Sequence, residues 1–173
     1  MKMLRKFGIS LLAMLALVGI ASAQKWQPLT HPATFQAGAL ALLTDGTVLI
    51  HEEQDNFPQK WYKLTPDNTG SYVNGTIKPI ASTSSAYGPL YFGSVVLPDG
   101  RYIIEGGEYN NGSSAWTNLG AIYDPVKNKW TSMNPPSGWN NIGDAQATLL
   151  TNGTYMQADC CEGVNQALLD LKT

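Results

Sequence analysis

Three turn dipeptides recur at an almost constant spacing and constrain the fold of this chain more than any other feature. Asp45-Gly46, Asp99-Gly100 and Asn152-Gly153 each lie between two short apolar segments. These dipeptides are strong signals for tight β-hairpin turns, because their residues readily adopt positive φ angles. The turns are 54 and 53 residues apart, and regular spacing over three copies indicates a repeated supersecondary unit.

Each unit continues past its hairpin into further predicted strands. In the second unit the third strand surrounds Tyr123 and the fourth begins at Lys129; in the first unit these strands begin at Trp61 and Ser71. Four short strands in about fifty residues are typical of a β-propeller blade. Helix-length amphipathic periods are missing after the first 23 residues, so the predicted fold class is all-β. The predicted blades are 36–78, 91–133 and an incomplete 145–173.

The second unit resembles the kelch repeat. It has apolar hairpin strands, Gly106-Gly107 closing the second strand, Tyr123 in the third and Trp130 in the fourth. In place of the double glycine, the first unit has Glu52-Glu53 and the third has Asp159-Cys160. The resemblance implies about three kelch-type blades of four antiparallel strands, distantly similar to the propellers of galactose and glyoxal oxidases. It concerns the fold and does not fix a function.

The repeat does not make a closed ring by itself, because closure takes at least four blades. Residues 24–30 resemble the fourth strand that begins at Lys129, and they are predicted to be an orphan fourth strand. Three interpretations stay open: a truncated product of a longer gene, which we favour, several chains that assemble one ring, or a small β-sandwich. Open blades expose apolar faces, so self-association through these faces is also predicted.

The first 23 residues have the order of a secretory signal peptide. Basic residues at Lys2, Arg5 and Lys6 precede an apolar run from residue 7 to 20, and Ala21-Ser22-Ala23 forms a cleavage site. The alternative is a membrane anchor, but a run of about 14 residues is short of the roughly 20 that span a bilayer. We therefore expect cleavage after Ala23 and a secreted or periplasmic product.

The charge of the mature chain argues against two classes of partner. After residue 23 it has 8 Lys and Arg against 13 Asp and Glu, and the basic residues form no cluster. Nucleic acids and anionic membranes are bound through basic patches. The sequence therefore predicts no nucleic-acid partner and, after signal removal, no membrane partner.

Acidic and aromatic residues are predicted to gather on one face of the propeller. In a kelch-like blade, the loops between strands two and three and between successive blades open on the same face, where the family's ligand sites lie. Aromatic rings there can stack on a sugar ring while carboxylates and amides fix its orientation. The alternative is that these loops are simply polar. The predicted ligand-binding residues are Glu52, Glu53, Asp55, Tyr87, Glu108, Tyr109, Trp139, Asn140, Asp144, Asp159 and Glu162.

Cys160 and Cys161 are the two cysteines of the chain and are adjacent. Disulfides persist in exported proteins. A bond between neighbours joins Cα atoms only about 3.8 Å apart, below the usual disulfide range, so it is strained and more easily reduced. Two hypotheses stay open: the cysteines pair with each other, or one or both pair with cysteines in further blades.

No cofactor, metal or catalytic residue is predicted. The kelch resemblance brings in the radical copper oxidases similar to galactose and glyoxal oxidase, which need a Tyr cross-linked to a Cys, a second Tyr next to a His, and a further His. His31 and His51 are the two histidines of this sequence, and no Tyr-His dipeptide occurs. The predicted function is an extracytoplasmic scaffold that binds a carbohydrate or a protein through its loop face. The alternative is a fragment of a kelch-type oxidase or sugar-isomerising enzyme whose catalytic residues lie in missing blades.

Overall fold

The three recurrent turns close three β-hairpins of one design in the computed structural model, which describes residues 24–54, 59–161 and 163–171. The predicted signal peptide lies outside the described residues. The hairpins are β1 and β2 (Ala37–Leu42 and Val48–Glu52), β6 and β7 (Gly93–Val96 and Tyr102–Glu105), and β12 and β13 (Ala147–Leu149 and Tyr155–Ala158).

The first turn shows why the dipeptide is needed. The Gly46 N–H donates to the Leu43 carbonyl at 3.1 Å, and the Leu43 N–H donates to the Thr47 carbonyl at 2.8 Å. Asp45 Oδ1 accepts from the Thr47 N–H at 2.9 Å, and Gly46 has a φ of 81°. This is the three-residue hairpin loop in which glycine alone takes the left-handed conformation. The turns at residues 97–101 and 150–154 repeat the same backbone and side-chain bonds.

All strand pairs are antiparallel and form three large sheets and one small sheet. Blade one has the order β1-β2-β3-β4, blade two β6-β7-β10-β11 and blade three β12-β13-β14. The added strands are β3 (Trp61–Thr65), β4 (Thr76–Pro79), β10 (Gly120–Asp124), β11 (Lys129–Met133) and β14 (Gln166–Leu169). The small sheet joins β5 (Pro89–Leu90), β8 (Tyr109–Asn110) and β9 (Ser113–Ser114).

This architecture confirms the predicted all-β fold of partial propeller blades, with four strands in each of the first two. No helix occurs among the described residues, so none there is long and apolar enough to cross a membrane. The small sheet was not predicted. It places Tyr109, which was expected in a loop, in a short strand.

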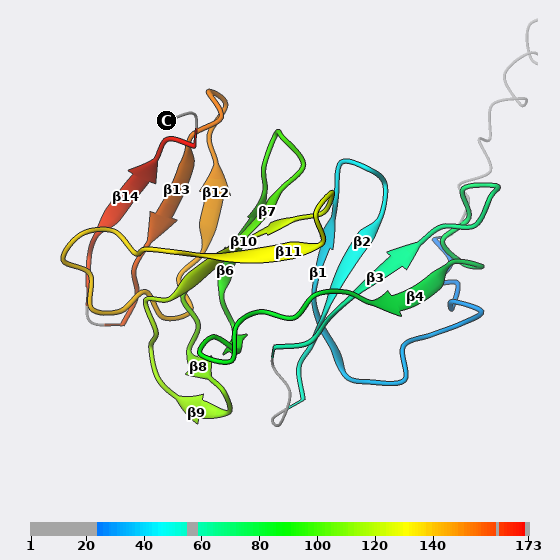
Figure 1. Cartoon of the computed structure of the whole chain (residues 1–173), viewed down its shortest axis with the longest axis horizontal. Coiled ribbons are helices and arrows are strands. Elements are labelled where there is room, and N and C mark those ends of the chain that lie inside the picture. Colours follow the sequence, from blue (N-terminus) through cyan, green and yellow to red (C-terminus); the bar gives the residue numbers. More distant parts are fainter. Residues whose placement is uncertain (1–23, 55–58, 162, 172–173) are drawn as a thin grey trace, which may run out of the picture.

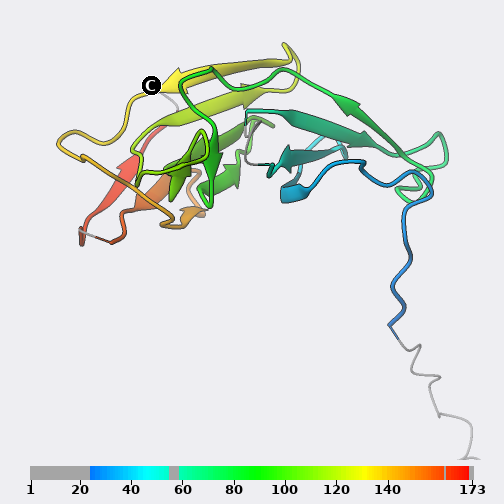
Figure 2. The same ribbon diagram turned by 90° about the horizontal axis from the view of Figure 1, so that it is seen from below.

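The three blades lie side by side, with β6 contacting both β1 and β12. The hairpin turns point to one side, at the top of Figure 1, and β8, β9 and the loop between β13 and β14 lie on the other. Figure 2 shows that the row of sheets bends into an arc, with β11 on its convex side. We call the side of β8 and β9 the loop face. The loops of blades two and three therefore meet on one side of the molecule.

Strand β7 is buried over its whole length, because it lies between two other blades. Alternate side chains of a strand point to opposite faces. Tyr102 and Ile104 belong to the core shared with blade one, whereas Ile103 belongs to the core shared with blade three. Glu105 shares the face of Ile103 and is 1% exposed. Strand alternation thus places a carboxyl group between blades two and three.

Aromatic rings fill the core between blades one and two. The centroids of Trp61 and Trp130 are 4.9 Å apart, and those of Tyr123 and Trp130 are 5.1 Å apart. Trp130 Nε1 donates to the Ala81 carbonyl at 2.9 Å, and the Tyr123 hydroxyl donates to Asn128 Oδ1 at 2.9 Å. The kelch-like Tyr and Trp positions of the second unit therefore join neighbouring blades.

Two segments differ from the strands expected from the sequence. Residues 24–30 form no strand, Trp26 is 98% exposed, and the Thr30 N–H donates to the Val73 carbonyl. The fourth strand of blade one begins at Thr76, because the Gly75 N–H bonds back to the Tyr72 carbonyl in a turn.

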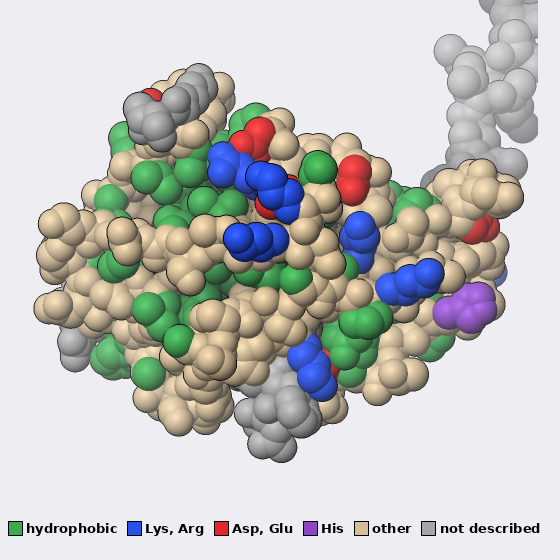
Figure 3. Space-filling model, viewed as in Figure 1, with side chains coloured by type: hydrophobic (Ala, Val, Ile, Leu, Met, Phe, Trp, Pro, Cys, Tyr) green, Lys and Arg blue, Asp and Glu red, His purple; other side chains and the backbone are tan. Residues whose placement is uncertain are grey.

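Apolar side chains remain exposed on the first and third blades. They are Leu40 and Leu42 of β1 and Leu168 and Leu169 of β14. In Figure 3, hydrophobic side chains gather over blade three, and Lys and Arg side chains form a band across the middle of the same view. The exposed leucines lie on the outer blades, where the sequence predicts self-association through open apolar faces.

Candidate functional site

Three loops of blades two and three are joined by backbone hydrogen bonds on the loop face. The Gly107 N–H donates to the Gly143 carbonyl at 2.6 Å, and the Ile142 N–H donates to the Thr117 carbonyl at 3.1 Å. The Cys160 N–H donates to the Ile142 carbonyl at 3.1 Å. These bonds connect the β7–β10, β11–β12 and β13–β14 loops. The backbones of three separate loops are thereby held together on this face.

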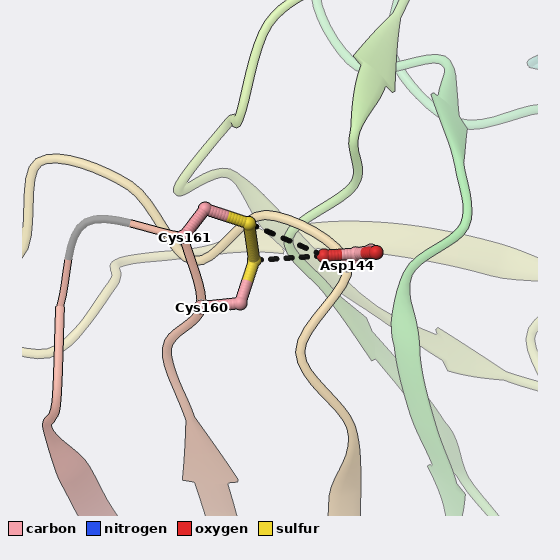
Figure 4. A group of neighbouring side chains, drawn as sticks. All are labelled: Asp144, Cys160 and Cys161. Carbon is pink, nitrogen blue, oxygen red and sulfur yellow. Dashed lines mark hydrogen bonds between the residues drawn. A yellow bond between two sulfur atoms is a disulfide. The ribbon is translucent and has the colours of Figure 1, made fainter.

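The adjacent cysteines form a disulfide beside an exposed carboxylate (Figure 4). Asp144 Oδ1 lies 2.7 Å from Cys160 Sγ and 3.5 Å from Cys161 Sγ. Asp144 and Cys161 are exposed, and Cys160 is half-buried. Of the two pairing hypotheses, the structure shows the bond between neighbours.

Gly143 is the point where the disulfide and an aromatic ring approach the backbone. A Cβ atom at this position would lie 2.5 Å from Cys160 Sγ and 3.5 Å from Trp116 Cδ1. Gly143 also has a φ of 65°, which is unfavourable for residues with a side chain. Trp116 is 42% exposed. We define the Gly143 site as Trp116, Asp144, Cys160 and Cys161.

The Gly143 site combines groups of the kinds that proteins use to bind polyols. The indole of Trp116 and the disulfide offer weakly polar surface for the C–H face of a sugar ring, and the Asp144 carboxylate accepts hydrogen bonds from hydroxyl groups. Trp116 was missed at the sequence level. Its signal was a tryptophan in the long loop after the second strand of the best-matching repeat, the same class of loop that supplied Glu108 and Tyr109.

Other predicted residues lie on or near the loop face outside this site. Trp139 is half-buried in the loop of Asp144, and its carbonyl accepts from Asn118 Nδ2 at 2.8 Å; Asn140 beside it is exposed. Glu108 and Tyr109 are half-buried, and the Tyr109 ring packs edge-on against Tyr91 at 6.0 Å.

Asp159 has a structural role in the loop before β14. Its carboxylate accepts from the Asn165 N–H at 2.8 Å and from Asn165 Nδ2 at 2.7 Å. These bonds close the loop that carries the two cysteines.

Two predicted ligand residues are buried, because they take part in the packing of the blades. The Tyr62 hydroxyl donates to Glu52 Oε2 at 2.7 Å, and the Lys60 ammonium lies 3.9 Å from Glu52 Oε1. Tyr87 donates to the Gly106 carbonyl at 2.8 Å within the aromatic core. Both side chains are 3% exposed, so neither offers a surface to a ligand in this structure.

The remaining predicted residues are Glu53, Asp55 and Glu162. Glu53 is half-buried, and its N–H donates to the Gln36 carbonyl in blade one. Asp55 and Glu162 lie outside the described residues. Among the residues that the structure describes, Asp144, Cys160 and Cys161 thus lie together with Trp116 around Gly143, and the other described residues of the prediction lie outside that group.

A cavity of about 110 Å³ lies between blades two and three, and a buried carboxyl group, that of Glu105, lines it. Glu105, Tyr155 and Gln157 line it together with apolar side chains of β14. Glu105 Oε1 has no hydrogen-bond partner within the described chain. The Tyr155 hydroxyl donates to Gln157 Oε1. We call this space the interblade cavity.

Burial sets the proton affinities in the interblade cavity. It raises the pKa of Glu105 to about 7, and the nearby Tyr155 hydroxyl opposes part of this rise. Burial, followed by the charge of Glu105, raises the pKa of Tyr155 far above its usual range. The cavity therefore holds a carboxyl group that exchanges its proton near neutral pH beside a phenol that stays protonated.

The two histidines do not gather with other potential metal ligands. His51 is fully buried, with its ring 4.6 Å from that of Trp61, and His31 is exposed in the segment before β1. Within the described ranges, Asp144, Cys160 and Cys161 are the one group of at least three His, Cys, Asp or Glu residues with mutually close ligand atoms. Asp144, Cys160 and Cys161 contain no imidazole, so they do not fit the copper centre of the kelch-type oxidases discussed above.

Neither a family model nor a curated protein matches this sequence. Among solved structures, the chain is similar to a fungal alcohol oxidase of the AA5 family in complex with copper, with a TM-score of 0.52 and 17% identity over 69% of this chain and 26% of that one. It is also similar to YjhT, with a TM-score of 0.51 and 19% identity over 76% of this chain and 35% of that one.

These likenesses support a propeller fold and leave the family open. At 17% and 19% identity they concern the fold alone. The chain spans about a quarter to a third of the length of the two proteins. The function must therefore be argued from the residues of the site.

Proposed function

We propose that this chain is an extracytoplasmic propeller segment that binds a carbohydrate through the Gly143 site. The observation that supports the proposal is the convergence of an exposed indole, a disulfide and an exposed carboxylate from three hydrogen-bonded loops. A sugar presents an apolar C–H face and a rim of hydroxyl groups, and these features match the indole and the carboxylate. A carbohydrate fits this small site better than a protein partner, which needs a much larger surface.

Binding is tested by screening the purified chain on a glycan array and titrating the best glycan by calorimetry. Trp116→Ala and Asp144→Asn should each weaken binding about tenfold or more, because a buried stacking contact or charged hydrogen bond contributes roughly 1.5 to 3 kcal/mol. Trp26→Ala is the matched control, since Trp26 is an exposed tryptophan outside the site. Equal affinity in the Trp116 and Trp26 variants would refute the proposed site.

A second candidate is a segment of an oxidase or sugar-isomerising enzyme whose catalytic residues lie in other blades. The likeness to the fungal alcohol oxidase fold supports this candidate. Copper-dependent hydrogen peroxide production from alcohols or aldehydes by a longer chain that carries further blades would favour it, whereas the same activity in the purified chain alone would contradict it. We expect no such activity, because His31 and His51 are the two imidazoles of the sequence.

A further inference from the structure

The ligand atoms of Asp144, Cys160 and Cys161 all lie within 4.8 Å of one another. They come from two loops that the bond from the Cys160 N–H to the Ile142 carbonyl holds together. Asp159 closes the second loop through its two bonds to Asn165. The positions of the three side chains are therefore fixed by backbone contacts in addition to the disulfide itself.

The disulfide is placed where a reductant can reach it. Cys161 is exposed, and the Cα atoms of the pair are 3.8 Å apart, less than most disulfides span. Cys161 has a φ of 76°, in the left-handed region that residues with a side chain rarely adopt. Exposed disulfides under backbone constraint are the more readily reduced class.

We propose that the reduced pair and Asp144 form a binding site for Zn²⁺. An external dithiol transfers two electrons and two protons to the S–S bond, which becomes two thiols, and the dithiol is oxidised to its own disulfide. Zn²⁺ then displaces the two thiol protons, which pass to solvent. Two thiolates and one carboxylate are ligands that zinc accepts.

The chemistry of the three groups favours a thiophilic cation once the disulfide opens. Two thiolates beside Asp144 bring three negative charges together, and a divalent cation removes most of that repulsion. The exposed position of Asp144 and Cys161 leaves room for water as a fourth ligand. The oxidised pair has no thiolate to offer, so the redox state of the pair decides whether the site exists.

The test compares oxidised and reduced chain in a competition titration of Zn²⁺ against a chromophoric chelator. The chain is reduced with a phosphine, desalted without oxygen and titrated with ZnCl₂. We expect one Zn²⁺ per reduced chain and none per oxidised chain. Cys160→Ser and Cys161→Ser should each abolish Zn²⁺ binding in competition with the chelator. Asp144→Asn should weaken Zn²⁺ binding about tenfold.

Asp99→Asn is the matched control, because Asp99 is an aspartate of a hairpin turn on the opposite side of the molecule. Sulfur-to-cobalt charge-transfer absorption after Co²⁺ addition reports thiolate coordination directly, and Trp fluorescence shows whether each variant keeps its aromatic core. Lack of binding by folded reduced chain, one Zn²⁺ per two chains, or equal affinity in the Asp144 and Asp99 variants would overturn the proposal. None of these readouts depends on carbohydrate binding.

Discussion

Replacement of Glu105 by glutamine should change how the stability of the chain depends on pH. Burial raises the pKa of Glu105 from 4.5 to about 7 in the folded state. Below pH 4.5 the carboxyl is neutral in both the folded and the unfolded chain, so its ionisation costs nothing. Between about pH 4.5 and pH 7 the unfolded chain has released this proton, whereas the folded chain keeps it on the buried carboxyl group. The free energy of unfolding therefore falls as the pH rises from about 4.5 to 7, and it levels off above that interval.

The size of the effect follows from the two pKa values. A difference of roughly 2.5 pKa units at about 1.4 kcal/mol each gives about 3.5 kcal/mol. Glu105→Gln keeps the shape of the side chain and removes its ionisation. We expect the variant to gain about 3.5 kcal/mol relative to the parent between pH 4.5 and pH 8. This gain is a large fraction of the net stability of a domain.

Urea unfolding followed by tryptophan fluorescence measures this difference, because Trp61 and Trp130 are buried in the blade core. The informative quantity is the change with pH, since a constant offset between parent and variant reports amide packing alone. Glu108→Gln, in the half-buried loop beside β8, is the control for the loss of one carboxylate. Parallel stability curves for the parent and Glu105→Gln from pH 4.5 to 8 would refute the reasoning.

Three further predictions concern other parts of the chain. Ile103→Ala should lower the free energy of unfolding, measured in urea, by about 2 to 4 kcal/mol, because Ile103 is fully buried between blades. The control Val126→Ala, at an exposed site, should change it by under about 0.5 kcal/mol. Equal effects of the two substitutions would contradict the interblade core. Gly143→Ala should cost about 1 to 3 kcal/mol in the same assay, because its Cβ meets Cys160 Sγ at positive φ; unchanged stability would argue against this loop geometry. Mass spectrometry of an exported product should show Gln24 as the first residue, and an intact Met1 would contradict the signal-peptide prediction.

The hairpins and the all-β architecture could be predicted because their causes are local. Gly46 takes a positive φ and the preceding aspartate bonds to Thr47, so a dipeptide carries nearly all the information for the turn. The apolar strands on either side follow from the same short segments. Glu105 was visible in principle as the one charge in the buried strand Tyr102–Glu105, but its raised pKa depends on blade three packing over that face.

Burial and convergence were decided by the tertiary structure alone. Glu52 and Tyr87 fall in segments that the repeat assigns to the loop face, yet packing between blades encloses both side chains. Trp116 and the disulfide both approach Gly143 because backbone bonds join Thr117, Ile142 and Cys160 across three loops. Such contacts link residues about 20 to 45 positions apart in the sequence, and no local pattern specifies them. The sequence by itself determined the turns, the strands and the chemistry available, whereas the packing of the sheets decided which of these groups meet.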